Sequence, residues 1–205
     1  PRSHERGVGR RPTLVHNAET LAHLALVARY GPDWFRQAGT PDEPGTALVT
    51  VSGAVAAPGV LEVGLGTPLG TLLDLAGGPT EPPAALLLGG FGGTWLPARH
   101  LGTPLTRRDL APLGAAPGAG VVVALPRLAC GLTETARILA HLAAQSARQC
   151  GPCLFGLPAA AEAFAILAAV PDHPAHLAPL PRRHGPLPAP ARTRPPARGS
   201  RASPP

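Results

Sequence analysis

The sequence contains no methionine and no lysine among its 205 residues, and it has only three cysteines. Because aromatic residues make up 3% of the chain, any core must be built from Leu, Val and Ala side chains. Three cysteines are too few for the disulfide framework of a small secreted domain, and no signal peptide is visible, so we expect a cytoplasmic protein. Without Met at position 1, we interpret the sequence as a fragment or a processed product.

Acidic residues are absent after Asp172, although six of the 18 arginines follow it. The net charge of +6 therefore belongs to the last part of the chain, and the part up to Asp172 carries equal numbers of arginines and acidic residues. A nucleic-acid-binding protein is expected to gather its basic residues on a folded surface. The charge distribution accordingly argues against a nucleic-acid partner.

Long apolar segments are also missing, since no run of about 18 apolar, uncharged residues occurs in the sequence. We therefore expect no direct insertion into a membrane. Association with the inner face of the cell membrane would come through partner subunits rather than through this chain.

The apolar pattern of the first two thirds of the chain predicts a mixture of a helix and several short strands. Asn17 is placed to cap a helix over residues 17–30, which Gly31 ends. Short apolar runs bounded by Gly and Pro then predict strands, with one short helix between them. The order of these elements is that of a β-grasp unit. The strands are predicted over residues 47–53, 60–63, 85–88 and 120–125, and the short helix over 69–75.

The glycine-rich segment 89–93 could be mistaken for a phosphate-binding loop. It lacks the Lys-Ser/Thr pair that such a loop needs, and it does not open a helix. We therefore predict a β-turn there.

Cys150 and Cys153 form a C-x₂-C pair on a Gly-Pro turn between two predicted helices, over residues 132–149 and 154–170. The second helix would begin at the pair, where its dipole favours thiolate over thiol. Such a pair can bind a metal or cluster, or close a redox disulfide. Zinc would need two further ligands, of which His141 is the nearest imidazole in the sequence. Two free thiols on a turn are the remaining alternative.

Three ordered motifs resemble the flavoprotein subunit of NADH:quinone oxidoreductase (respiratory complex I). Residues 12–21 read PTLVHNAETL, similar to the P-T-x-V-N-N-V-E-T-L signature of that family, and a DWF motif follows at 33–35. Residues 44–60 look like the family's soluble-ligand-binding β-grasp module. Residues 146–153 read SARQCGPC and resemble its S-C-G-x-C-x-P-C cluster motif.

The resemblance implies an α+β chain that corresponds to the C-terminal half of that subunit. Residues 1–45 would be the end of the FMN-binding domain with a connecting helix, and 46–126 the β-grasp (ubiquitin-like) module. Residues 127–172 would be a small helical bundle that binds an iron–sulfur cluster. The Pro- and Arg-rich residues 173–205 are predicted to be disordered, since they cannot bury enough apolar surface to offset the ordering entropy.

The family's cofactors, FMN and a [4Fe–4S] cluster, are only partly provided for in this sequence. His16 and Asn17 occupy a flavin-contacting position, although Asn17 can equally be a plain helix cap. Cys150 and Cys153 would be cluster ligands, but Ala147 replaces the family's first cysteine and no cysteine follows Cys153. A cubane cluster needs four anchors, so the ligand set is incomplete. We predict that Cys130 is a buried structural thiol rather than a ligand.

The function that the resemblance implies is electron transfer from NADH to FMN to an iron–sulfur cluster, within an NADH dehydrogenase complex and beside its other subunits. The protein would position the cofactors, which carry the electron chemistry. Because the NADH pocket is not in this sequence, the chain alone is expected to be inactive in NADH oxidation. The alternative is a non-catalytic β-grasp module for binding or assembly, without a working cluster.

Overall fold

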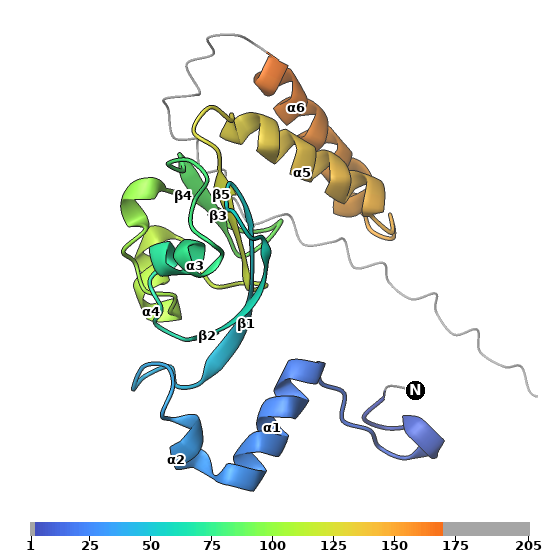
Figure 1. Ribbon diagram of the computed structural model, residues 1–205. Helices are drawn as coiled ribbons and strands as arrows, with labels where there is room; N and C mark the ends of the chain where they lie inside the picture. The colour runs from blue at the N-terminus through green and yellow to red at the C-terminus, as the bar shows by residue number, and fades with distance from the viewer. Residues whose placement is uncertain (1–2, 170–205) are drawn as a thin grey trace, which may run out of the picture. The chain divides into compact units, whose positions relative to one another are not determined.

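The computed structural model describes residues 3–169, so the predicted disordered tail 173–205 and the last residues of the predicted helical domain lie outside the described residues. The centre of the fold is a five-stranded mixed sheet (Figure 1). Its strand order is β2-β1-β5-β3-β4, with β1 parallel to β5 and the other neighbours antiparallel. The strands are β1 (Thr46–Gly53), β2 (Gly59–Gly64), β3 (Ala85–Leu88), β4 (Thr94–Pro97) and β5 (Val121–Leu125).

The predicted α+β class is confirmed, and this sheet is consistent with the predicted β-grasp-like module. β1 and β2 form the expected hairpin, with Val49 opposite Leu61. β5 lies in the middle of the sheet, between β1 and β3. Its sequence VVVAL is apolar at every position because a central strand is covered on both of its faces.

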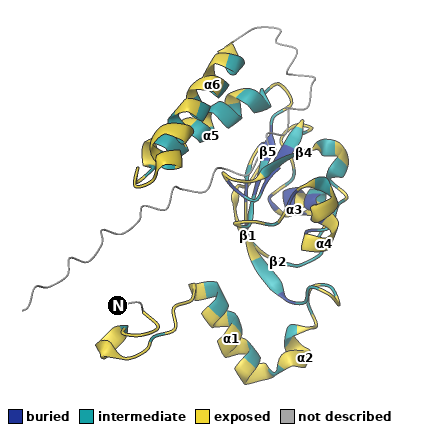
Figure 2. Cartoon of the chain, turned by 180° about the vertical axis from the view of Figure 1, so that it is seen from behind, coloured by how far each residue is buried: buried dark blue, intermediate teal, exposed yellow. Residues whose placement is uncertain are grey.

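The buried core lies on one face of the sheet, against α3 (Leu69–Leu75) and α4 (Arg107–Leu110). Strand residues alternate between this core and the opposite face, as the two-residue period of a strand requires. Val49 and Val51 of β1 are buried, whereas the preceding residue Leu48 is about half exposed. Figure 2 shows the buried residues gathered in the sheet and in α3.

Three short elements were not predicted from the sequence: β4, α4 and α2 (Pro32–Phe35). Each has only four residues, too few to show a period. β4 forms because it pairs with β3 across the glycine turn at 89–93, where the Gly93 N–H donates to the Gly90 carbonyl at 2.9 Å. The predicted β-turn is therefore confirmed. Single 3₁₀ turns complete this part of the fold, at Val8–Arg10, Ala98–His100 and Ala111–Leu113.

The first long helix, α1 (Ala18–Tyr30), has nearly the predicted bounds. The Asn17 Oδ1 accepts a 2.8 Å hydrogen bond from the Thr20 N–H, so Asn17 is the predicted helix cap. No residue of α1 is buried. The Glu19 carboxylate accepts a 2.9 Å hydrogen bond from the Leu48 N–H of β1, which satisfies a backbone donor where β1 extends past the end of β5.

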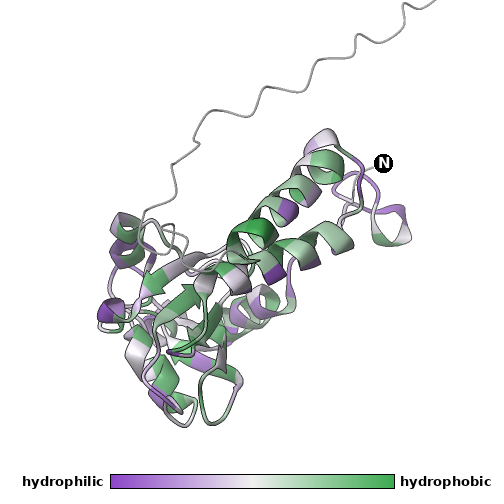
Figure 3. Ribbon diagram, turned by 90° about the horizontal axis from the view of Figure 1, so that it is seen from above, coloured by the Kyte–Doolittle hydropathy of each residue, from purple (hydrophilic) through white to green (hydrophobic). Residues whose placement is uncertain are grey.

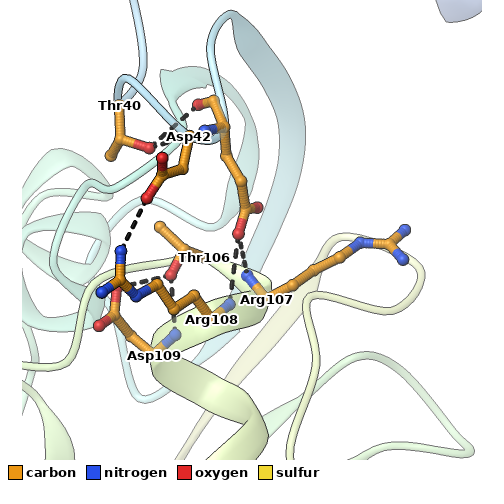
Figure 4. A network of polar contacts seen from close by, with 7 residues as sticks. Thr40, Asp42, Thr106, Arg107, Arg108 and Asp109 are labelled. Atoms are coloured by element: carbon orange, nitrogen blue, oxygen red, sulfur yellow. Dashed lines mark hydrogen bonds and ion pairs between the residues drawn. The ribbon is translucent and has the colours of Figure 1, made fainter.

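The loop before β1 is held against the start of α4 by acidic side chains. The Glu43 carboxylate accepts hydrogen bonds from the backbone N–H groups of Arg107 at 2.8 Å and Arg108 at 3.3 Å. These are donors that the first turn of a helix leaves without partners. Asp42 forms a 2.7 Å ion pair with the Arg108 guanidinium, and the Thr106 hydroxyl donates to Asp109 at 2.6 Å (Figure 4).

The chain continues into a helical hairpin in which α5 (Gly131–Gln145) packs against α6 (Leu157–Ala169). A π-helical turn, η4 (Pro152–Gly156), leads directly into α6. No residue of either long helix is buried in the part of the chain that the structure describes. In Figure 3, apolar colouring runs along the long helices with few hydrophilic interruptions.

One described helix, Pro152–Ala169, is long and apolar enough to cross a membrane by length and composition. Its mean hydropathy is 1.6 and none of it is buried. The sequence offers no run of about 18 apolar, uncharged residues, and Glu162 lies within this helix. One carboxylate among 18 residues leaves the helix apolar on average, and the expected absence of direct membrane insertion stays a prediction.

Candidate functional site

The two thiols of the C-x₂-C pair lie at the junction of the helical hairpin, as the sequence predicts. Cys150 stands just before the π-helical turn, and its carbonyl accepts a 2.9 Å hydrogen bond from the Leu154 N–H. Cys153 lies within that turn. The Ser146 hydroxyl, at the end of α5, donates to the Cys153 carbonyl at 3.4 Å and also accepts from the Arg148 N–H at 3.2 Å.

The two cysteines of the pair differ in exposure and in pKa. Cys150 is exposed, whereas Cys153 is half-buried. Hydrogen bonds from the Cys153 side chain and from its backbone N–H lower the pKa of the Cys150 thiol. The same side-chain hydrogen bond, followed by burial, raises the pKa of the Cys153 thiol. The arrangement favours a thiolate at Cys150 and a thiol at Cys153 that donates to it.

The residues at this junction do not fit a [4Fe–4S] cluster. Within the described residues, no group of three or more His, Cys, Asp or Glu side chains is placed to hold a metal ion. Ala147, at the position of the family's first cysteine, cannot ligate. His141, the candidate zinc ligand, packs edge to face against Phe91, with 5.2 Å between the ring centroids. Two thiolates are half of the anchors that a cubane or a structural zinc site requires.

Cys130 lies at the other end of the hairpin helix α5, directly before its first residue. It is half-buried, so the prediction of a buried thiol is wrong. The Thr133 N–H, in the first turn of α5, donates to the Cys130 sulfur and lowers the pKa of this thiol. Cys130 therefore occupies the N-cap position of α5.

The predicted flavin-contacting residues His16 and Asn17 are both exposed. The Asn17 side-chain oxygen is already used as the cap of α1. A flavin site needs a concave surface with several convergent donors, and these two residues alone do not form one. The flavin contacts of His16 and Asn17 therefore stay a prediction.

A cavity of about 700 Å³ lies between the sheet and α5, on the sheet face opposite the buried core. This cavity was not predicted from the sequence. A signal for it exists, because the unbroken apolar runs of β3 and β5 indicate that both faces of these strands are covered. Trp95 of β4 crosses to α5 here, since its Nε1 donates a 3.0 Å hydrogen bond to the Thr135 hydroxyl. The principal apolar residues of its wall are Leu87, Phe91, Trp95, Val123, Leu125 and Ile138.

The charged groups at this cavity are paired with each other. The Arg137 guanidinium lies 2.7 Å from the Glu134 carboxylate, one turn away on α5. His141 lies against Phe91 at the same rim. The volume is in the range of pockets that take small molecules, and the walls suit an apolar group.

The sheet region of the chain matches a known domain family. Residues 48–94, from β1 to the beginning of β4, match the SLBB domain family. The fold and this match define the chain as one that contains an SLBB domain.

The relatives are subunits of NADH-quinone oxidoreductases and of an NAD-reducing hydrogenase. The chain is 33% identical over 148 residues to the NADH-quinone oxidoreductase F subunit of Streptomyces coelicolor, a match that covers 71% of this chain and 33% of that protein. It is 32% identical over 149 residues to an F subunit of Rhizobium meliloti, covering 71% of this chain and 35% of that protein. Over 67 residues, 33% of this chain and 11% of the relative, it is 43% identical to the NAD-reducing hydrogenase HoxS subunit alpha of Cupriavidus necator.

A solved structure of an NAD⁺-reducing [NiFe]-hydrogenase in the air-oxidised state matches with a TM-score of 0.67 and 33% identity, over 82% of this chain and 29% of that chain. The resemblance to the flavoprotein subunit of NADH:quinone oxidoreductase and its hydrogenase relatives is therefore confirmed. The chain spans about one third of the length of these relatives.

Proposed function

We propose that this chain acts within an NADH-oxidising electron-transfer complex, as an SLBB-containing module that binds or assembles the complex and carries no [4Fe–4S] cluster of its own. The similarity to the NADH-quinone oxidoreductase F subunit supports the place in such a complex. The other subunits of that complex would be its partners, and FMN and NADH would be held outside this chain.

The proposal that this chain carries no [4Fe–4S] cluster is supported by the number of possible metal ligands at the helical hairpin. Cys150 and Cys153 stand together, and no third His, Cys, Asp or Glu joins them within the described residues. The whole sequence has one further cysteine, Cys130, which lies at the opposite end of α5. An electron-carrying cubane at this junction would lack two anchors.

Two measurements test the two halves of the proposal. After anaerobic reconstitution with iron and sulfide, the purified chain is expected to hold no stoichiometric cluster and to give no EPR signal on reduction. A content of about four iron and four sulfide per chain, with the EPR signal of a reducible cluster, would contradict the proposal that the chain carries no cluster. Reconstitution of the Streptomyces coelicolor relative in parallel is the positive control.

Membership of the complex is tested in the native cell. A tagged chain is expected to migrate on a native gel with a band that stains for NADH oxidation, and the free chain is expected not to stain. Migration of the chain away from every such band would remove the proposed place in the complex. NADH oxidation by the free chain would contradict the placement of the NADH site outside it.

A further inference from the structure

We propose that Cys150 and Cys153 are a redox-active dithiol, which closes to an intramolecular disulfide by exchange with a small-molecule disulfide such as oxidised glutathione. This inference goes beyond the proposed function and does not depend on membership of an electron-transfer complex. Its starting point is that no third metal-binding side chain joins the pair within the described residues, while both thiols lie on one helical turn.

The geometry of the turn brings the two sulfurs together. Cys150 and Cys153 are separated by Gly151 and Pro152, and the hydrogen bond between Leu154 and Cys150 folds these residues into a helical turn. The two cysteines are three positions apart on this turn, a spacing that puts both side chains on the same side of a helix. Closing the disulfide therefore needs a local adjustment of the side chains rather than a rearrangement of the helices.

The two cysteines differ in access, and this difference assigns their roles. Cys150 is exposed and can be reached by an external disulfide, whereas Cys153 is half-buried behind it. A Cβ built on Gly151 meets nothing within 4 Å, so the space beside the turn is open. Cys150 is thus the attacking sulfur, and Cys153 is the resolving sulfur.

The surroundings of Cys150 favour its thiolate, which is the nucleophilic form. Cys150 stands at the start of the helical run that continues into α6, where the helix dipole favours a thiolate. The lowered pKa of Cys150 agrees with this environment.

The exchange balances in two steps. The Cys150 thiolate attacks one sulfur of the small disulfide, whose S–S bond breaks and releases one thiolate. Cys153 then gives its proton to that thiolate, and its sulfur attacks the Cys150 sulfur of the mixed disulfide, releasing the second thiolate, which takes a proton from water. Two protein thiols are oxidised by two electrons, and the small disulfide is reduced to two thiols.

The test equilibrates the full chain in glutathione buffers from fully reduced to fully oxidised, quenches with acid, and alkylates the remaining thiols before mass spectrometry. Cleavage after arginine separates Cys130, between Arg127 and Arg137, from the pair that follows Arg148. In oxidising buffer, Cys150 and Cys153 are expected to be protected together as an internal disulfide, while Cys130 is alkylated.

Single substitutions separate the roles of the three thiols. Cys153→Ser is expected to stop at a glutathione adduct on Cys150, and Cys150→Ser to lose the internal disulfide. Cys130→Ser is the matched control, and it should leave the midpoint of the pair unchanged. The proposal is overturned if the wild-type pair stays alkylatable in oxidised glutathione, or if Cys153→Ser forms its adduct on Cys130 rather than on Cys150. Neither result depends on the iron content or the gel migration that test the proposed function.

Discussion

Trp95 in β4 and Thr135 in α5 join the sheet to the helical hairpin through a 3.0 Å hydrogen bond from the indole Nε1 to the threonine hydroxyl. The Thr135 hydroxyl in turn donates to the Gly131 carbonyl at 2.7 Å, in the first turn of α5. Because a hydroxyl has one donor and two acceptor positions, both bonds are satisfied at once. One side chain thus fixes the start of α5 over the apolar cavity.

Trp95→Phe is expected to remove this hydrogen bond while keeping an aromatic ring in the cavity wall. The loss should be about 1 kcal/mol of the free energy of unfolding, with faster amide hydrogen exchange at the start of α5. Trp34→Phe is the control, because the Trp34 ring is partly exposed and stacks against Tyr30 instead. Equal losses in the two variants would contradict the role of the indole N–H.

Glu43→Ala is expected to destabilise the protein by about 1 kcal/mol, because two backbone N–H groups at the start of α4 lose their acceptor. Asp42→Ala is the neighbouring control. It breaks an exposed ion pair to Arg108, and such a pair contributes at most about 0.5–1 kcal/mol. Urea unfolding of both variants measures the two losses of unfolding free energy. A larger loss for Asp42→Ala than for Glu43→Ala would contradict the prediction.

Gly53→Ala is expected to cost at least about 1–3 kcal/mol. Gly53 has a φ of 85°, and a Cβ at this position would collide with the Ala124 carbonyl of β5. Gly102→Ala is the matched control, since a Cβ there meets nothing within 4 Å. Thermal unfolding of the two variants compares them directly. A loss at Gly53 no greater than that at Gly102 would show that the close approach of β1 and β5 is wrong.

Asn17→Ala is expected to weaken α1 by about 1 kcal/mol, because the Thr20 N–H loses its acceptor. α1 buries no residue, so the change should appear as local fraying and faster hydrogen exchange at Thr20 rather than as lower global stability. Asn17→Asp should preserve the cap, and the neighbouring His16→Ala should have no effect. If Asn17→Ala and Asn17→Asp behave alike, the cap is not the role of this side chain.

The contribution of Cys130 to the free energy of unfolding is expected to depend on pH. The sign follows from the lowered pKa of this thiol in the folded chain. A thiol with a folded pKa below its unfolded value contributes stability above the unfolded pKa, and this contribution is lost as the pH falls through the folded pKa. The difference in unfolding free energy between the wild type and Cys130→Ala should therefore grow between neutral pH and about pH 10. Urea unfolding under reducing conditions measures it, and a constant or shrinking difference would falsify the assignment.

Much of the fold could be predicted from local sequence alone. Asn17 before an apolar helix, and Gly31 after it, gave the bounds of α1. Apolar runs bounded by Gly and Pro located β1, β2, β3 and β5, because β-branched and Leu-rich segments of this length favour extended backbone and the flanking residues end it. The spacing of the C-x₂-C pair likewise placed two thiols on one turn.

Other features depend on residues that are far apart in the sequence. β4 exists because β3 lies beside it, and α4 begins where Glu43 can accept its backbone N–H groups from 64 positions away. The prediction for Cys130 failed for a similar reason, since its burial depends on what packs over the start of α5.

The amino-acid sequence by itself determined which residues form four of the five strands, where the first helix is capped, and that the given sequence offers three thiols. Only the tertiary structure decided that Leu21 and Leu24 of α1 stay exposed and that a cavity opens between β3, β5 and α5. It also decided that Cys150 and Cys153 differ in exposure. A periodic pattern states which side chains could be buried, but burial requires a partner surface, and that surface comes from segments that the pattern does not connect.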